Sequence, residues 1–252
     1  MIKKIVKKIF NLFGVRLIML KKEEIPKEFV ENYKRNLKQL EENSGGYNIF
    51  KSFRYDAGVH PKDQIDAQYE FLASHLSKLG APLNILDIGS HRHFLLGLLI
   101  NHRLTTIDVR ERRQHLANEK IITCDAKNLK VPDNEFDVVT SVCSLEHFGL
   151  GRYGDEFDLD ADKKAFKEMV RALKPGGHLI FTTVIHNSTP SIVFNAEKIY
   201  NREMINEFCS GLTCVEEKFY SYKNREFCSF DNIIAKPNGR DIYCGCWLKP
   251  SK

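Results

Sequence analysis

From residue 83 onward, short apolar runs typical of buried strands alternate with segments that have helical spacing. The strand-like runs are NILDIG, LTTIDV, KIITC, FDVVTSVC and GHLIFTTV, and 213–222 and 241–248 are two further candidates. Alternation of this kind predicts parallel strands joined by helices that cover both faces of one sheet. We therefore expect an α/β fold: a doubly wound, mostly parallel, seven-stranded sheet, preceded by N-terminal helices.

The segment before this pattern is helical and more polar. A polar helical stretch runs from residue 27 to about 42, and apolar residues recur at helical spacing over 62–79. We expect three parts: an N-terminal helix (1–22), a helical lead-in (23–82) and the main domain (83–252). With 252 residues and 42% hydrophobic content, the chain is long enough for one sizeable core.

Positive charge is concentrated at the N-terminus. Residues 1–22 hold seven of the 38 basic residues and no acidic one, which leaves 31 basic against 33 acidic residues in the rest. The main domain is therefore not expected to carry a nucleic-acid-binding face. Residues 1–22 predict a basic amphipathic helix, broken near Gly14 and too short in its apolar runs to span a membrane. Such a helix either lies on an anionic membrane surface or packs on protein.

The seven cysteines favour reduced thiols in a cytoplasmic protein. Cys244 and Cys246 lie in the strand-like DIYCGCWL, so both side chains are expected on the same face of the sheet. No second pair has metal-ligand spacing, which makes a zinc site the less favoured interpretation.

Acidic residues close the first two predicted strands. Asp87 ends the first, and Asp108 ends the second, where a carboxylate can accept two hydrogen bonds from a ribose diol. Both NAD and S-adenosylmethionine (SAM) bring that diol. A pyrophosphate calls for a G-x-G-x-x-G turn, but this turn has glycine only at Gly89. A single glycine, with Arg92 able to meet a carboxylate, fits SAM better. An NAD-dependent oxidoreductase is the less favoured alternative.

Two longer stretches carry a family resemblance. CDAKNLKVPDNEFDVVTSVCSLEHFG (124–149) and KEMVRALKPGGHLIFTT (167–183) resemble the middle and late motifs of class I SAM-dependent methyltransferases, of the type 11 kind. With LDIGS and TTIDV, the resemblance covers roughly residues 83–185 and implies a Rossmann-like fold. The turn LKPGGHLIFT is its most specific signal. The chain departs from the family in the first motif, where a second glycine is often found.

The resemblance also implies roles for individual residues in holding SAM. Those at the first turn would meet its methionine end, Asp108 and its neighbour would hold the ribose, an acid-Ala pair would meet the adenine, and the end of the fourth strand would flank the sulfonium. The cofactor-binding residues implied are Asp87, Gly89, Ser90, Arg92, Asp108, Val109, Asp125, Ala126 and Val142.

A narrower resemblance concerns the acceptor. EHFGLGRYGDEFDLDAD (146–162) and FNAEKIYNREM (194–204) are similar to a methyltransferase group associated with bacterial surface-polysaccharide synthesis. This similarity implies a sugar hydroxyl as acceptor, in a glycan or a nucleotide- or lipid-linked precursor. His147 and Glu146 are the catalytic candidates, with a structural role as the alternative for each. The substrate-binding candidates are Arg152, Tyr153 and Asp155. The acidic run 155–162 is more typical of a solvated stretch before a helix than of a metal site.

The sequence thus predicts a cytoplasmic enzyme that transfers methyl from SAM to an oxygen of a sugar, with peripheral membrane contact through residues 1–22 as one option. A non-catalytic partner with the same fold, acting in polysaccharide assembly, remains the alternative. Methylation of nucleic acid is disfavoured, because SVCSLEH stands where adenine-N6 enzymes carry an Asp/Asn-Pro-Pro-aromatic corner.

Overall fold

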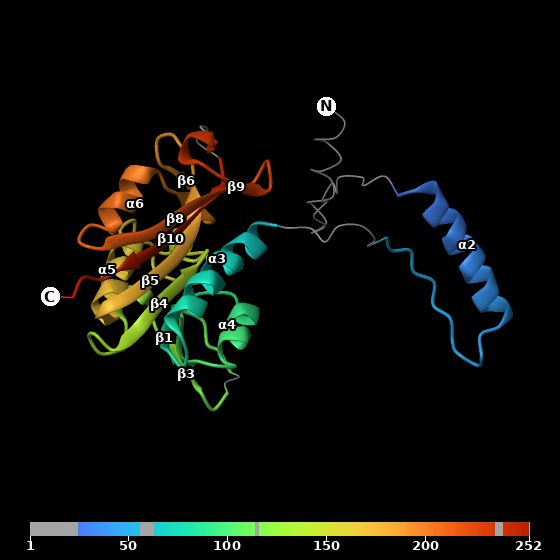
Figure 1. Cartoon of the computed structure of the whole chain (residues 1–252), viewed down its shortest axis with the longest axis horizontal. Coiled ribbons are helices and arrows are strands. Elements are labelled where there is room, and N and C mark those ends of the chain that lie inside the picture. Colours follow the sequence, from blue (N-terminus) through green and yellow to red (C-terminus); the bar gives the residue numbers. More distant parts are fainter. Residues whose placement is uncertain (1–24, 56–62, 114–115, 235–238, 252) are drawn as a thin grey trace. The chain divides into compact units, whose positions relative to one another are not determined.

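The computed structural model describes residues 25–55, 63–113, 116–234 and 239–251. Contacts divide the chain into two compact units, Met1–His60 and Pro61–Lys252. Figure 1 shows the elements of both units. The predicted N-terminal helix 1–22 lies outside the described residues. Helix α3 (Gln64–Leu79), which the sequence prediction grouped with the lead-in, instead packs on strands of the second unit.

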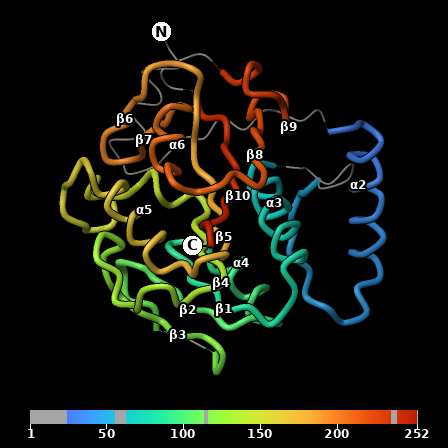
Figure 2. Tube along the Cα trace, turned by 60° about the vertical axis from the view of Figure 1, so that its left-hand side comes forward, coloured from blue at the N-terminus to red at the C-terminus, as the bar shows by residue number. Residues whose placement is uncertain are grey.

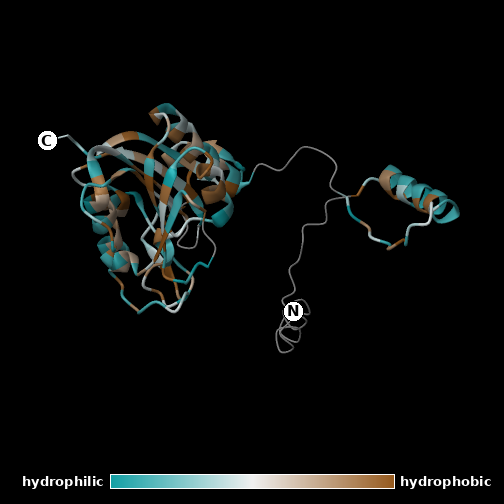
Figure 3. Cartoon of the chain, turned by 90° about the horizontal axis from the view of Figure 1, so that it is seen from below, coloured by the Kyte–Doolittle hydropathy of each residue, from teal (hydrophilic) through white to brown (hydrophobic). Residues whose placement is uncertain are grey.

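The first unit contains one described helix, α2 (Lys27–Glu42), as the polar helical pattern predicts. No residue of α2 is buried, and in Figure 3 most of this helix has the teal colour of hydrophilic residues. Its aromatic side chains face those of the following segment: the Phe29 ring centroid lies 4.6 Å from that of Tyr55, and the Tyr33 centroid lies 4.9 Å from that of Phe53.

An eight-stranded sheet forms the centre of the second unit. Its strand order is β3-β2-β1-β4-β5-β10-β8-β9. The first five strands in this order are parallel, and β10, β8 and β9 continue the sheet in antiparallel pairing. The strands are β1 (Asn84–Ile88), β2 (Arg103–Asp108), β3 (Glu119–Thr123), β4 (Phe136–Val142), β5 (Leu173–Ile185), β8 (Thr213–Ser221), β9 (Glu226–Cys228) and β10 (Asp241–Leu248).

Helices cover both faces of this sheet (Figure 1). Side chains alternate along each strand, so Ile85 and Leu86 of β1 enter different cores. Helices α3 and α4 (Arg92–Leu98) close the core that contains Ile85, whereas α5 (Ala161–Ala172) and α6 (Arg202–Phe208) close the one that contains Leu86. The predicted doubly wound α/β fold is confirmed.

The strand count differs from the prediction of seven in a minor way. Short β9 adds an eighth strand at the edge, because 226–228 pairs with the end of β8. Strands β6 (Ser191–Val193) and β7 (Glu197–Ile199) form a separate hairpin, which Figure 2 shows near α6. Three-residue strands carry too little alternating pattern to be recognised in a sequence.

Cys244 and Cys246 are both buried on the face that α3 and α4 cover, as the strand alternation predicts. All seven cysteines are free thiols. Within the described ranges, no group of three or more His, Cys, Asp or Glu side chains is arranged to hold a metal ion. None of the helices in those ranges is long and apolar enough to cross a membrane.

The loop after β4 is tightly folded around glycines. Gly149, Gly151 and Gly154 all have positive φ. The Asp155 carboxylate accepts hydrogen bonds from the N–H groups of Gly149 (2.8 Å) and Tyr153 (3.1 Å). A Cβ at Gly149 would overlap the Asp158 carbonyl oxygen, whereas one at Gly154 would meet nothing within 4 Å.

We predict that Gly149→Ala lowers the free energy of unfolding by about 3 kcal/mol, because backbone strain and overlap add. Gly154→Ala is the matched control, and its positive φ alone should cost about 1 kcal/mol. Urea denaturation followed by circular dichroism measures both. Equal losses in the two variants would show that the Gly149 contact does not hold the loop.

Candidate active site

A cleft of about 1150 Å³ opens at the carboxyl ends of β1, β2 and β4. Its walls come from α3, the turn after β1, the end of β2 and the loop after β4. A smaller annexe, lined by Val109, Asp125, Ala126 and Phe148 among others, shares Gly89, Asp108, His147 and Tyr153 with the cleft. The cleft therefore lies at the edge of the sheet where the sequence predicts the functional site.

The turn after β1 is built on a buried carboxylate. Asp87 is 1% exposed and accepts hydrogen bonds from the Ser90 hydroxyl (2.5 Å), the Ser90 N–H (3.1 Å) and the Thr140 hydroxyl (2.7 Å). Burial raises the pKa of Asp87 to about 6, against the lowering effect of these hydrogen bonds. The Ser90 hydroxyl in turn accepts the N–H of Val142 (3.1 Å), which joins the turn to β4. Asp87 thus shapes the turn from beneath and lines neither cavity.

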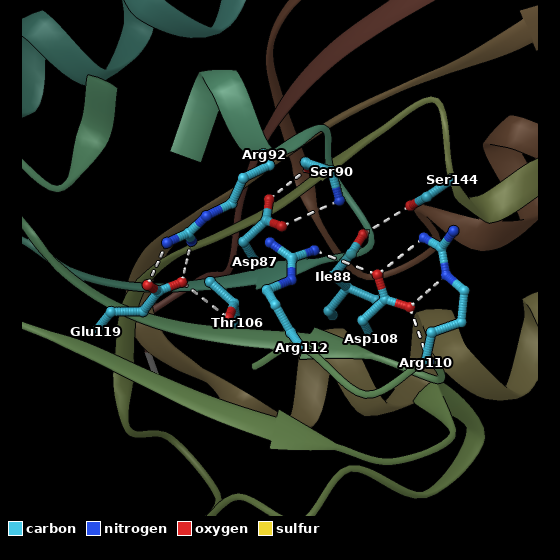
Figure 4. Close-up of polar contacts among 10 residues, drawn as sticks. All are labelled: Asp87, Ile88, Ser90, Arg92, Thr106, Asp108, Arg110, Arg112, Glu119 and Ser144. Carbon is cyan, nitrogen blue, oxygen red and sulfur yellow. Dashed lines mark hydrogen bonds and ion pairs between the residues drawn. The ribbon is translucent and has the colours of Figure 1, made fainter. Parts of the chain in front are cut away.

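Gly89 and Arg92 complete this turn, and Figure 4 shows Arg92 directed toward Glu119. Gly89 has φ 73°, and a Cβ there would lie 2.9 Å from the Ser144 Cβ, so glycine is required on both counts. Arg92 lines the cleft, but its guanidinium is held by buried Glu119 of β3, with Nη2 2.7 Å from Oε2. The sequence predicts that Arg92 meets a carboxylate of the cofactor. In the structure it binds a carboxylate of the protein, that of Glu119.

Asp108 ends β2 at the junction of the cleft and the annexe. Its Oδ1 accepts the Arg110 N–H (2.9 Å) and Nε–H (3.0 Å), and its Oδ2 accepts Nη2 of Arg110 (3.0 Å) and of Arg112 (3.2 Å). Figure 4 shows the two arginines reaching the carboxylate from two sides. Burial acts to raise the pKa of Asp108, but these hydrogen bonds outweigh it and hold the pKa below its usual value. All four acceptor positions of the carboxylate are therefore engaged.

The annexe combines apolar walls with one carboxylate, as the sequence predicts for an adenine pocket. Val109, Ala126 and Phe148 supply apolar walls, and Asp125 supplies a carboxylate at the end of β3. One oxygen of Asp125 caps the short helix η1 (Ala126–Asn128) by accepting the Lys127 N–H at 2.9 Å. The other oxygen lies 3.5 Å from Lys127 Nζ.

His147 is the side chain best placed to take a proton. It closes the short helix η2 (Leu145–His147) after β4 and lines both cavities. Its Nδ1 lies 2.6 Å from the Ala196 carbonyl oxygen. Since a carbonyl only accepts, the contact assigns the donor role to Nδ1 and leaves Nε2 as the ring nitrogen that can accept.

Glu146 also lines the cleft but is nearly inaccessible. It is 1% exposed, and its Oε2 accepts the Thr183 hydroxyl at 3.1 Å. Burial raises the pKa of Glu146 above its usual value, while the proximity of His147 and several hydrogen bonds act to lower it. These contacts favour a role for Glu146 in fixing the end of β4 over a direct role at the substrate.

A buried ion pair anchors the β6–β7 hairpin that supplies the Ala196 carbonyl. Lys198 Nζ lies 2.6 Å from Asp162 Oδ1, and the Tyr200 hydroxyl donates to Asp162 Oδ2 at 2.9 Å. Lys198 also donates to the Leu159 carbonyl (2.7 Å). Lys198 and Asp162 are 4% and 1% exposed, so this pair joins α5 to the hairpin in the interior and holds the carbonyl that orients His147.

Arg152 and Tyr153 lie at the mouth of the cleft. The Tyr153 ring centroid is 6.0 Å from that of His147, and the guanidinium carbons of Arg110 and Arg152 lie 4.6 Å and 5.2 Å from the Tyr153 ring centroid. Asp155, the third predicted substrate residue, uses both carboxylate oxygens to fold its own loop.

The sheet order and the cleft at the carboxyl ends of its parallel strands are those of a Rossmann-like α/β fold. Residues 86–181 match the family described as methyltransferase domain. SAM is the cofactor of this class of domain.

Among curated proteins, the chain is similar to malonyl-[acyl-carrier protein] O-methyltransferase of Marinomonas sp. (strain MWYL1), with 28% identity over 165 residues. The match covers 58% of this chain and 57% of that protein, so the chain spans little more than half the length of this relative.

Solved structures share the fold. The [4+2]-cyclase SpnF is 18% identical, with a TM-score of 0.58, over 88% of this chain and 95% of that one. A Burkholderia thailandensis 1,6-didemethyltoxoflavin-N1-methyltransferase with bound S-adenosylhomocysteine (SAH) is 13% identical, with a TM-score of 0.55, over 92% and 94%. NodS of Bradyrhizobium japonicum WM9 in complex with SAH is 20% identical, with a TM-score of 0.53, over 75% and 89%.

The residues present fit SAM, apart from the state of Asp108. The carboxylate at the end of β2, the apolar annexe with Asp125 and the single-glycine turn supply what a ribose, an adenine and an amino-acid end require. The conflict is that Arg110 and Arg112 hold the acceptor positions that ribose hydroxyls would use. Because the Arg110 side chain is 58% exposed, it can turn out into solvent and release the carboxylate.

We predict that Arg110→Ala tightens SAH binding two- to fivefold. Arg110 competes for Asp108, and an ion pair whose arginine is solvent-exposed contributes about 0.5–1 kcal/mol. Isothermal titration calorimetry with SAH measures the change, and Arg225→Ala, in the β8–β9 turn, is the control. Weaker SAH binding by Arg110→Ala would show that Arg110 supports the cofactor directly.

Several site residues carry no sequence signal. Arg110 and Arg112 follow β2 without a motif, and Thr140 and Thr183 read as ordinary strand residues. Ala196 contributes only its backbone carbonyl to the site, which no side-chain pattern can reveal.

Proposed function

We propose that this chain transfers a methyl group from SAM to a hydroxyl oxygen of a sugar, in a glycan or in its nucleotide- or lipid-linked precursor. The observation that carries the proposal is the state of His147. His147 lines the cleft, and its Nδ1 is committed to the Ala196 carbonyl, so Nε2 would be the ring nitrogen that accepts a proton.

A hydroxyl is a weak acid, so it needs a base as its oxygen becomes bonded to carbon. Bound SAM supplies an electrophilic methyl group on a positively charged sulfur, which departs as a neutral thioether. Asp108 would hold the ribose, and the annexe around Asp125 and Ala126 the adenine. Gly89 and Ser90 would meet the methionine end, and Val142 would flank the sulfonium. As the new oxygen–carbon bond forms, Nε2 of His147 takes the hydroxyl proton. The ion pair beneath the hairpin keeps that nitrogen in place.

Two considerations support oxygen on a sugar as the target. The curated relative is named as an O-methyltransferase. In addition, the two stretches that resemble the polysaccharide-associated group, 146–162 and 194–204, meet beside the cleft. His147 contacts Ala196, Asn195 Nδ2 lies 3.5 Å from the Leu150 carbonyl, and Lys198 pairs with Asp162. The two segments that carry this resemblance thus come together beside the cleft.

The test is methyl transfer from radiolabelled SAM to glucose, glucose 1-phosphate and UDP-glucose, with glycine and putrescine as amine acceptors. We expect label in a sugar product that mass spectrometry shows to have gained one methyl group on oxygen. Transfer to the amines alone would overturn oxygen as the target. SAH binding without transfer to any acceptor would favour the non-catalytic partner. Membrane contact through residues 1–22 and a cytoplasmic location remain predictions from the sequence.

A further inference from the structure

The arginine side chains that line the cleft outnumber the carboxylates that pair with them. Of its lining arginines, Arg92 pairs with Glu119, Arg240 with Glu197, and Arg113 with Glu111. Arg110 and Arg112 share the single carboxylate of Asp108. Among the described residues, no carboxylate lies within 4.0 Å of the remaining one, Arg152.

We propose that the acceptor carries an anionic group, a phosphate ester or a carboxylate, and that Arg152 binds this group beside His147. The proposal rests on the proposed function and narrows its acceptor to charged sugars. Three further observations support it.

The first is the geometry of Arg152. Its guanidinium lies over the Tyr153 ring, with 5.2 Å between the Cζ atom and the ring centroid, which limits its movement. Only Nη1 has a hydrogen-bonded neighbour in the described structure, the Ala196 carbonyl at 3.4 Å, with His147 Nδ1 3.3 Å away. A guanidinium has five N–H donors, so most of those of Arg152 remain available for bidentate binding of an oxyanion.

The second observation is that two other arginine side chains line the same cleft. Arg110 lies over the same Tyr153 ring, with its Cζ 4.6 Å from the centroid. Nη1 of Arg112 is buried and has no hydrogen-bond partner among the described residues. Positive charge on one side of a partly desolvated cleft raises the local concentration of an anion.

The third observation links this site to the cofactor pocket. When Arg110 leaves Asp108, as a ribose at that carboxylate requires, its guanidinium has no other carboxylate within 4.0 Å among the described residues and still borders the cleft. The cofactor-loaded state should therefore bind anions better than the unloaded state. The hydroxyl to be methylated and the anionic group must lie close together in the acceptor, since Arg152 and His147 are adjacent.

The test uses the full chain saturated with SAH, in low-salt buffer because salt weakens exposed ion pairs. Calorimetry measures binding of glucose 1-phosphate, glucuronic acid and neutral glucose to wild type and to Arg152→Gln, Arg152→Lys and Arg103→Gln. We expect at least one anionic sugar to bind wild type about tenfold tighter than glucose does. Arg152→Gln should remove that margin. Arg152→Lys should keep part of it, because lysine retains the charge but not the planar pair of donors.

Arg103 is exposed at the opposite end of β2, so Arg103→Gln should leave the margin intact. Tighter binding of glucose 1-phosphate would identify phosphate as the group that Arg152 recognises, and tighter binding of glucuronic acid would identify carboxylate. The proposal is overturned if neither binds more tightly than glucose, or if Arg152→Gln retains the margin. It is also overturned if Arg152→Gln weakens SAH as much as it weakens the sugar, since Arg152 would then serve the cofactor. These titrations need no methyl transfer, so a failure of the proposed function would show separately in the transfer assay.

Discussion

Replacing Asp108 with alanine is expected to weaken SAH binding about 100-fold, measured by titration calorimetry. Hydrogen bonds to a charged group contribute about 1.5–3 kcal/mol each, and a ribose diol offers two. The net effect is smaller than their sum, because Arg110 and Arg112 already occupy the carboxylate and must be displaced. The net loss of binding free energy should be about 2.7 kcal/mol, which corresponds to a 100-fold increase in the dissociation constant.

Asp133→Ala is the matched control for this variant. Asp133 is also a carboxylate paired with an arginine, Arg171, but it lines neither cavity. Its loss should leave the dissociation constant for SAH unchanged. If Asp108→Ala binds SAH as wild type does, with an unchanged circular dichroism spectrum, the ribose site is not at the end of β2.

Replacing His147 with asparagine is expected to lower kcat by 10²- to 10³-fold, the usual contribution of a general base. The asparagine amide can still donate to the Ala196 carbonyl, as Nδ1–H does, so the loop should keep its conformation. No base then remains at the position of Nε2. Single-turnover transfer from labelled SAM, with the sugar acceptor that the screen identifies, measures the loss, and the dissociation constant for SAH should stay within twofold.

Glu146→Gln separates the two catalytic candidates. The glutamine amide keeps an oxygen for the Thr183 hydroxyl, so we expect a loss in kcat of less than tenfold. The opposite ranking, with Glu146→Gln inactive and His147→Asn active, would move the role of base to Glu146 and leave His147 as a support of the loop.

The fold could be predicted because its signals are local and repeated. Each parallel strand is a short apolar run bounded by turn residues, and buried strands tolerate little else. The position of Asp108 at the edge of the sheet follows for the same reason, since it ends β2 and the strand ends define that edge. Strand β9 and the β6–β7 hairpin were missed because three residues carry no usable period.

The polar partners within the site could not be predicted, because they depend on distances between elements. The sequence shows Arg92 next to the first turn, but not Glu119 of β3, which lies two strands away in the sheet and binds it. Likewise, Asp87 could be recognised as a site acid, but its burial beneath Ser90 and Thr140 depends on the packing of β1 against β4. Spacing identifies which residues reach the edge of a sheet, and only packing decides which of them face the cleft.

The central claim is that the cleft is a SAM site. Titration calorimetry of the wild-type chain with SAH and with NAD tests it most directly. The account predicts saturable, one-to-one binding of SAH and no detectable binding of NAD, because the turn at Gly89 lacks the glycines that a pyrophosphate needs. Binding of NAD, or failure of the folded protein to bind SAH, would contradict it.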